Sequence, residues 1–158
     1  MQVYDELDPD LKFQRNIPAA GAEFWQSLCK NGGLPKRRDI DPVAIPPAIL
    51  PHILLIDVEG KFPPRFRWRL IGTHTTNILG RDSTGKYIDA VLPTEIYNKF
   101  IEPLCWIIAN RKPARVWGHA DHVDKDWVSF ENLIAPLVDD SGDVTMIFSV
   151  AHYGNPDR

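Results

Sequence analysis

The chain has 158 residues, of which 44% are hydrophobic and 25% charged, with a formal net charge of −3 at pH 7. This length predicts one domain with a buried core, and the slightly acidic charge excludes a general nucleic-acid-binding surface. The two cysteines, Cys29 and Cys105, show no metal or redox spacing, and there is neither an apolar leader nor a membrane-length apolar run. We therefore expect a cytoplasmic protein with reduced thiols that binds neither nucleic acid nor membrane.

The N-terminal segment, residues 1–17, has little apolar periodicity and predicts a mobile acidic arm. Its acids are Asp5, Glu6, Asp8 and Asp10. A helix is expected over residues 19–30, where Trp25 and Leu28 follow helical spacing. Asn31-Gly32-Gly33 then ends the helix, because glycine accepts the left-handed conformation at a helix C-terminus.

A proline-rich segment, residues 34–52, resists long helices, and Asp41-Pro42 is typical of the start of a short turn. Two strands should follow over residues 53–59 and 65–72 and form a hairpin. The second of these strands alternates strictly. Phe66, Trp68 and Leu70 occupy one face, and Arg65, Arg67 and Arg69 occupy the other.

The second half of the chain predicts one long helix and then three strands. The helix follows Thr94 and is kinked or split at Pro103. The strands are expected over residues 113–121, 127–138 and 143–152. Asp139 to Asp143 forms a turn cluster between the last two.

Three features in this order resemble a PAS sensor domain of the bacterial single-domain family PAS_5. They are the step from the strand into Gly72-Thr73, the turn Gly80-Arg81-Asp82-Ser83-Thr84-Gly85, and the ending Ala135 to Val144. The resemblance covers residues 20–153. It implies an α+β fold: a five-stranded antiparallel sheet, short helices inserted between strands two and three, and a flanking N-terminal helix. The domain would span residues 18–153, with a tail over 154–158.

A curved sheet backed by short helices leaves a mostly apolar cavity, which suits a small apolar or aromatic ligand. Whether side chains fill this cavity is left open, and no cofactor can be named. The expected wall residues are Trp68, Leu70, Tyr87, Phe100, Leu104, Met146 and Phe148.

Two surfaces are candidates for protein contacts. Trp25 and Leu28 should pack on the sheet or on a second subunit, which would give a homodimer. The arginine stripe, Arg65, Arg67 and Arg69, lies on the outer face of its strand because guanidinium groups are not buried without partners. It is either a solvated face paired with acids such as Glu131, or a docking surface for an acidic partner.

No nucleophile, phosphate-loop or zinc motif is present, so we expect no catalytic residue, no metal and no enzyme. The histidines and aspartates between His119 and Asp124 fit a hairpin turn better than a metal site. His74 fits a capping or solvated histidine better than an axial haem ligand. His52 and His152 have no partner nearby in the sequence.

The resemblance therefore implies a stand-alone PAS-like sensory or interaction module that binds a small ligand or signals to a separate effector protein. The alternative is a small cone-shaped α+β protein of the NTF2-like type, which also has an apolar pocket. Element order separates the two folds. Such a cone begins with helices, whereas here a hairpin precedes the long helix.

Overall fold

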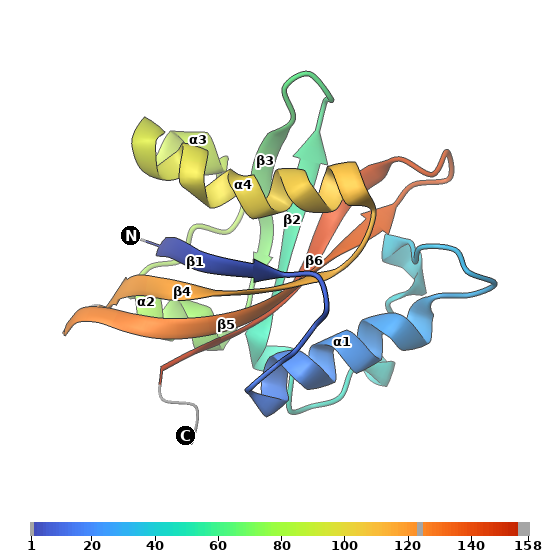
Figure 1. Ribbon diagram of the computed structural model, residues 1–158, viewed down its shortest axis with the longest axis horizontal. Helices are drawn as coiled ribbons and strands as arrows, with labels where there is room; N and C mark the ends of the chain where they lie inside the picture. Colours follow the sequence, from blue (N-terminus) through green and yellow to red (C-terminus); the bar gives the residue numbers. More distant parts are fainter. Residues whose placement is uncertain (1, 123–124, 155–158) are drawn as a thin grey trace.

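The computed structural model describes residues 2–122 and 125–154. They form one antiparallel six-stranded sheet in the order β1-β4-β5-β6-β2-β3 (Figure 1). The strands are β1 Gln2–Asp8, β2 Ile53–Glu59, β3 Arg65–Ile71, β4 Ala114–His122, β5 Lys125–Val138 and β6 Val144–Tyr153. All five predicted strands are present within a few residues of their expected bounds.

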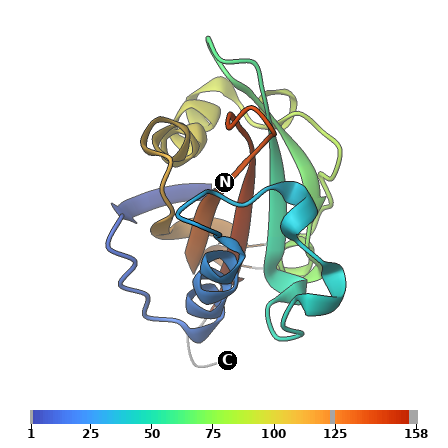
Figure 2. The ribbon, with the colours of Figure 1, turned by 90° about the vertical axis from the view of Figure 1, so that its right-hand side faces the viewer.

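Helices cover both faces of this sheet (Figures 1 and 2). Helix α1, Asn16–Leu28, contacts β5 and β6 on one face, together with three short 3-10 turns. Helices α2, α3 and α4 lie between β3 and β4 in sequence and cover the other face. Their bounds are α2 Thr73–Leu79, α3 Ile88–Val91 and α4 Thr94–Asn110, and the turns are η1 Arg37–Asp39, η2 Pro42–Ala44 and η3 Leu50–His52. The predicted α+β class is confirmed. No helix among the described residues is long and apolar enough to cross a membrane.

The N-terminal segment corrects one expectation. Residues 2–8 do not lie outside the sheet as an arm but form β1, which pairs with β4 along the sheet edge. A register shift between Tyr4 and Glu6 breaks the alternation, so Tyr4 and Leu7 pack on the same core although they are three residues apart. Because of this irregular spacing, the strand lacks the two-residue alternation by which a half-buried strand is predicted from sequence.

The sheet has a separate apolar core on each face. Under α2 and α4, the large buried side chains include Trp68, Phe66, Ile107 and Phe130. Under α1, the core is formed by Phe24, Trp25, Leu133, Phe148 and Val150 among others. Two buried faces explain why β5 and β6 are apolar along most of their length.

Trp25 packs against the sheet rather than a second subunit. Its side chain is only 4% exposed, and its Nε1 donates a hydrogen bond to the Pro136 carbonyl at 3.1 Å. Packing on the sheet is one of the two places expected for Trp25, whereas its assignment to an interaction surface is wrong. Leu28 is half-buried and packs on the same core.

Gly21 allows α1 to lie directly on β6. A Cβ at this position would sit 2.6 Å from Val150 Cγ2, and Val150 is fully buried. We expect Gly21→Ala to lower the free energy of unfolding by about 1–3 kcal/mol through overpacking, despite the helix propensity of alanine. Urea denaturation measures this loss. The double variant Gly21→Ala/Val150→Ala should show a favourable coupling between the two sites, and additive effects would contradict the proposed contact.

Candidate functional site

A cavity of about 360 Å³ lies between the sheet and the helices α2 and α4. Strands β2 to β6 supply most of its wall from their face under these helices. The apolar lining residues are Leu54, Ile56, Trp68, Ile71, Leu79, Leu92, Phe100, Pro103, Leu104, Val116, Phe130 and Ile134. Three of the predicted wall residues are therefore on the cavity: Trp68, Phe100 and Leu104.

Trp68 and Phe100 form an aromatic corner of this wall. Their ring centroids lie 6.1 Å apart with an interplanar angle of 72°, which is an edge-to-face arrangement. Trp68 is buried on β3, whereas Phe100 on α4 is half-buried. The cavity thus offers aromatic surface from two elements that are separate in sequence.

Polar groups interrupt the apolar wall at a few positions. Ser149 Oγ donates a hydrogen bond to Asn132 Oδ1 at 2.8 Å, and the amide nitrogen of Asn132 donates to no described residue. The Thr75 side chain is only 2% exposed, yet its Oγ1 has no hydrogen-bond partner among the described residues. The Asn132 amide nitrogen is therefore available to a bound molecule, whereas Thr75 Oγ1 is enclosed by its neighbours.

The rim of the cavity carries its charged and ionisable groups. Arg81, in the turn after α2, lines the cavity and is exposed. Tyr4 lines the cavity from β1, and its hydroxyl donates a hydrogen bond to Glu102. This bond to a carboxylate, together with burial, raises the pKa of Tyr4 to about 12, so the phenol stays neutral.

Leu70 does not line the cavity, so the prediction made from strict alternation along the strand is wrong at this residue. Between Leu55 and Ile56 the register shifts, so that Ile56 pairs with Trp68 while Leu55 pairs with Leu70. Arg69 is the extra residue of this bulge. The bulge turns Leu70 outward, where it is 41% exposed, and places Ile71 on the cavity instead.

Tyr87, Met146 and Phe148 are also absent from the cavity wall. Phe148 pairs with Leu55 and packs under α1, in the core on the opposite face of the sheet. Met146 is half-buried against that same core. Tyr87 lies beside β3. Its ring centroid is 3.5 Å from Arg65 Cζ, and its hydroxyl donates a hydrogen bond to Glu59.

Comparison with known proteins identifies the fold family. The profile of family PAS_5, described as "PAS domain", matches residues 17–151. This chain belongs to that PAS family. The observed order of hairpin, helices and three strands agrees with it and not with the NTF2-like cone.

A structure search matches this PAS domain to a solved chain titled "Structure of an RNA-binding Light-Oxygen-Voltage Receptor", with 19% sequence identity and a TM-score of 0.47. The match covers 76% of this chain, which spans 36% of the length of that chain. No curated protein matches this chain significantly.

The arginine stripe of the PAS domain is largely neutralised within the chain. Arg65 binds Asp89 through two hydrogen bonds, of 3.0 and 3.2 Å, and Arg67 binds Asp57 at 2.9 Å. Arg69 is exposed and forms no ion pair with a described residue. Glu131 is not the partner of this stripe, because it lies under the N-terminal segment and binds Arg115 at 2.6 Å.

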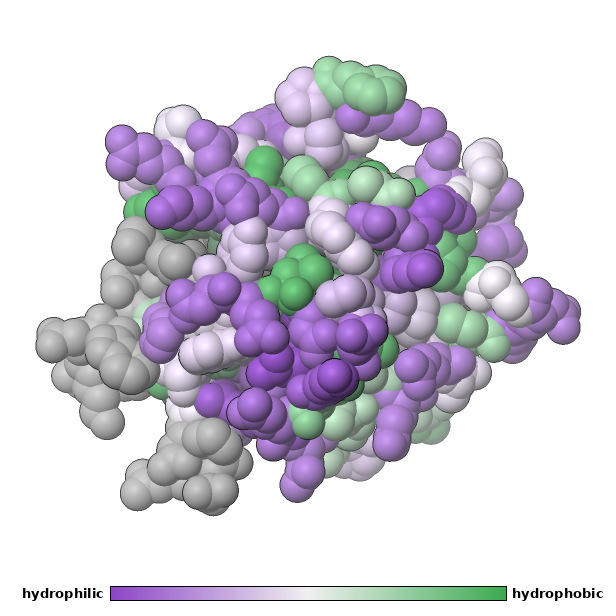
Figure 3. Space-filling model, viewed as in Figure 1, coloured by the Kyte–Doolittle hydropathy of each residue, from purple (hydrophilic) through white to green (hydrophobic). Residues whose placement is uncertain are grey.

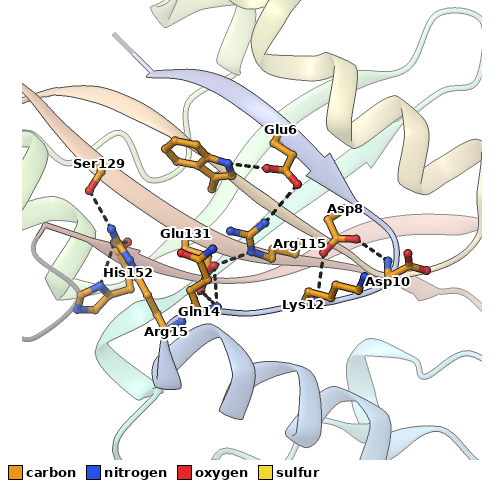
Figure 4. A network of polar contacts seen from close by, with 11 residues as sticks. Glu6, Asp8, Asp10, Lys12, Gln14, Arg15, Arg115, Ser129, Glu131 and His152 are labelled. Atoms are coloured by element: carbon orange, nitrogen blue, oxygen red, sulfur yellow. Dashed lines mark hydrogen bonds and ion pairs between the residues drawn. The ribbon is translucent and has the colours of Figure 1, made fainter.

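That pair belongs to a buried polar network between the N-terminal segment and the sheet (Figure 4). The Glu131 carboxylate also accepts hydrogen bonds from the backbone N–H groups of Gln14 and Arg15. The Arg15 guanidinium donates to Ser129 Oγ and to the His152 carbonyl, both at 2.8 Å. The network fixes the residues that join β1 to α1.

Three histidines that are far apart in sequence meet beside this network. The ring centroid of His74 lies 4.1 Å from that of His52 and 5.4 Å from that of His152. Tyr153 N donates to His74 Nε2, so this nitrogen is unprotonated in the neutral ring. Among the described residues, no group of histidine, cysteine and acid side chains is arranged to hold a metal ion.

This histidine cluster should make the fold acid-sensitive. Burial, and then repulsion from His52 and His152, lowers the pKa of His74 from 6.5 to about 4, and burial also lowers the pKa of His52. The unfolded chain therefore binds protons first as pH falls, so stability is full above pH 6.5 and is lost toward pH 4.

We expect the free energy of unfolding to fall by about 1–2 kcal/mol between pH 7.5 and 5.5, after allowing for partial exposure of the rings. His74→Gln, which keeps an acceptor for Tyr153 N, should remove about half of this loss. Urea denaturation at both pH values measures the difference. An unchanged pH dependence in His74→Gln would show that His74 is not the responsible group.

Proposed function

We propose that this PAS domain is a sensory module that binds a small, largely apolar or aromatic ligand in the cavity between the sheet and helices α2 and α4. The observation that supports this most directly is the cavity itself. Packed protein interiors contain few voids larger than a water molecule, and a cavity of about 360 Å³ lies in the size range of small-molecule sites.

The composition of the wall supports the same proposal. Ligand sites combine apolar and aromatic surface with a few placed polar groups. Here the aromatic corner of Trp68 and Phe100 accompanies Asn132, whose amide nitrogen donates to no described residue.

The signal would leave the domain through protein contacts, to a second copy of the chain or to an effector protein. Helices α2 and α4 wall the cavity and also reach the surface, so ligand binding can alter what they present. On the face shown in Figure 3, apolar side chains form small areas separated by hydrophilic ones. A partner on that face would make mainly polar contacts. Arg69, which is exposed, and Leu28, which is half-buried, remain candidates for protein contacts.

Calorimetric titration with the neutral probes indole and 2-naphthol tests ligand binding. Val116 lies on the cavity wall from β4, so Val116→Phe should fill part of the space. We expect micromolar binding to the natural chain and at least about ten-fold weaker binding to Val116→Phe, with the variant still folded by circular dichroism. Absence of probe binding to the natural chain, or equal binding to both proteins, would contradict the proposal.

A further inference from the structure

We infer that the ligand is a small aromatic carboxylate. This inference rests on the proposed function and adds the chemistry of the ligand. It follows from the arginine and from the apolar and aromatic side chains that line the cavity.

Arg81 supplies the cation. It is the one charged side chain among the described residues that line the cavity, and because it is also exposed, it lies where the cavity meets solvent. Arg81 forms no ion pair with a described residue, in contrast to Arg65 and Arg67. An arginine in this position can bind a carboxylate through two parallel hydrogen bonds.

The acidic residue next to Arg81 in the sequence does not bind its guanidinium group. The Asp82 carboxylate accepts hydrogen bonds from Thr84 N at 2.9 Å and from Thr84 Oγ1 at 2.6 Å, so it is held within its own turn. These hydrogen bonds lower the pKa of Asp82, which stays ionised at neutral pH. Asp82 does not line the cavity. Asp82 therefore leaves the Arg81 guanidinium available to a ligand carboxylate.

The rest of the wall favours a ring system as the body of the ligand. Its lining is mainly apolar, and Trp68 and Phe100 present aromatic surface in an edge-to-face arrangement.

The carboxylate is tested with 2-naphthoate and 2-naphthamide, which have nearly the same shape and differ in charge. We expect Arg81→Gln to weaken binding of 2-naphthoate about five- to ten-fold and to change binding of 2-naphthamide less than two-fold. Arg69→Gln is the matched control, because Arg69 is an exposed arginine without a described ion pair that does not line the cavity. This control should leave both affinities unchanged.

The outcomes separate this inference from the function on which it rests. If the natural chain binds none of the naphthyl compounds, indole or 2-naphthol, the proposed function fails. If 2-naphthamide binds as well as 2-naphthoate and Arg81→Gln changes neither, the cavity binds ligands but the carboxylate is wrong.

Discussion

Replacing Glu131 with alanine is expected to lower the free energy of unfolding by about 3–5 kcal/mol, because it leaves a buried charge without its partner. The Glu131 side chain binds Arg115, whose side chain is only 5% exposed. It also accepts hydrogen bonds from the backbone N–H groups of Gln14 and Arg15, and these groups would lose their acceptor in the variant. The substitution should therefore detach the segment that joins β1 to α1 as well as weaken the sheet.

Glu6→Ala is the control for this prediction. Glu6 lies 3.6 Å from the same Arg115 and is exposed, so its loss should cost about 1 kcal/mol or less. Urea denaturation of the two variants gives the comparison, and hydrogen exchange at the amides of Gln14 and Arg15 should be faster in Glu131→Ala. Equal stabilities of the two variants would show that the buried network does not hold the N-terminal segment in place.

The second large effect is expected from Phe148→Ala, which should cost about 3–5 kcal/mol. Phe148 is almost completely buried under α1, and its ring centroid lies 6.0 Å from that of Phe24. Phe100→Ala should cost less, about 1–2 kcal/mol, because Phe100 is half-buried and borders a space that already exists. Binding of 2-naphthol should show the opposite order. It should fall at least about ten-fold in Phe100→Ala and stay nearly unchanged in Phe148→Ala.

Thermal denaturation and calorimetric titration of the same two variants measure both quantities. The comparison is informative because both substitutions remove the same atoms from opposite sides of one sheet. If Phe100→Ala were as destabilising as Phe148→Ala and bound 2-naphthol as well as the natural chain, the region around Phe100 would be ordinary packed core.

Most of the fold follows from local sequence signals. The hairpin of β2 and β3, the glycines after α1 and the Asp139–Asp143 turn mark element ends through backbone conformation, which depends on neighbouring residues only. Asp41 accepts a hydrogen bond from Val43 N at 3.0 Å, as the Asp-Pro pair predicts. Strand β1 was not predictable in this way, because its bulge removes the alternation that marks a half-buried strand.

The cavity was only partly predictable, and the reason lies in the two cores. In β6, consecutive apolar residues face alternately toward the cavity and toward α1, and both faces are buried. Nothing in the local pattern shows that Ser149 faces the cavity whereas Phe148 faces α1. Likewise, the bulge at Arg69 places Ile71 on the cavity wall instead of Leu70, and strict alternation does not predict this change.

Long-range polar contacts were beyond prediction for a different reason. His52, His74 and His152 approach one another only because η3, α2 and the end of β6 converge. The same is true of Glu131 and the N–H groups of residues 14 and 15. Their signal in sequence is limited to charged residues in otherwise apolar strands, such as Glu131 in β5, which indicates a buried partner without naming it.

The location of ligand binding is the central claim, and the tryptophan side chains of the chain can report it directly. Of the five tryptophans, Trp68 lines the cavity, whereas Trp25 lies under α1 on the other face of the sheet. Titration with 2-naphthol, followed by nitrogen–proton correlation spectra, should shift the indole N–H signal of Trp68 in a saturable manner and leave that of Trp25 in place. A saturable shift at Trp25 with none at Trp68, or no saturable shift at all, would contradict the cavity as a ligand site.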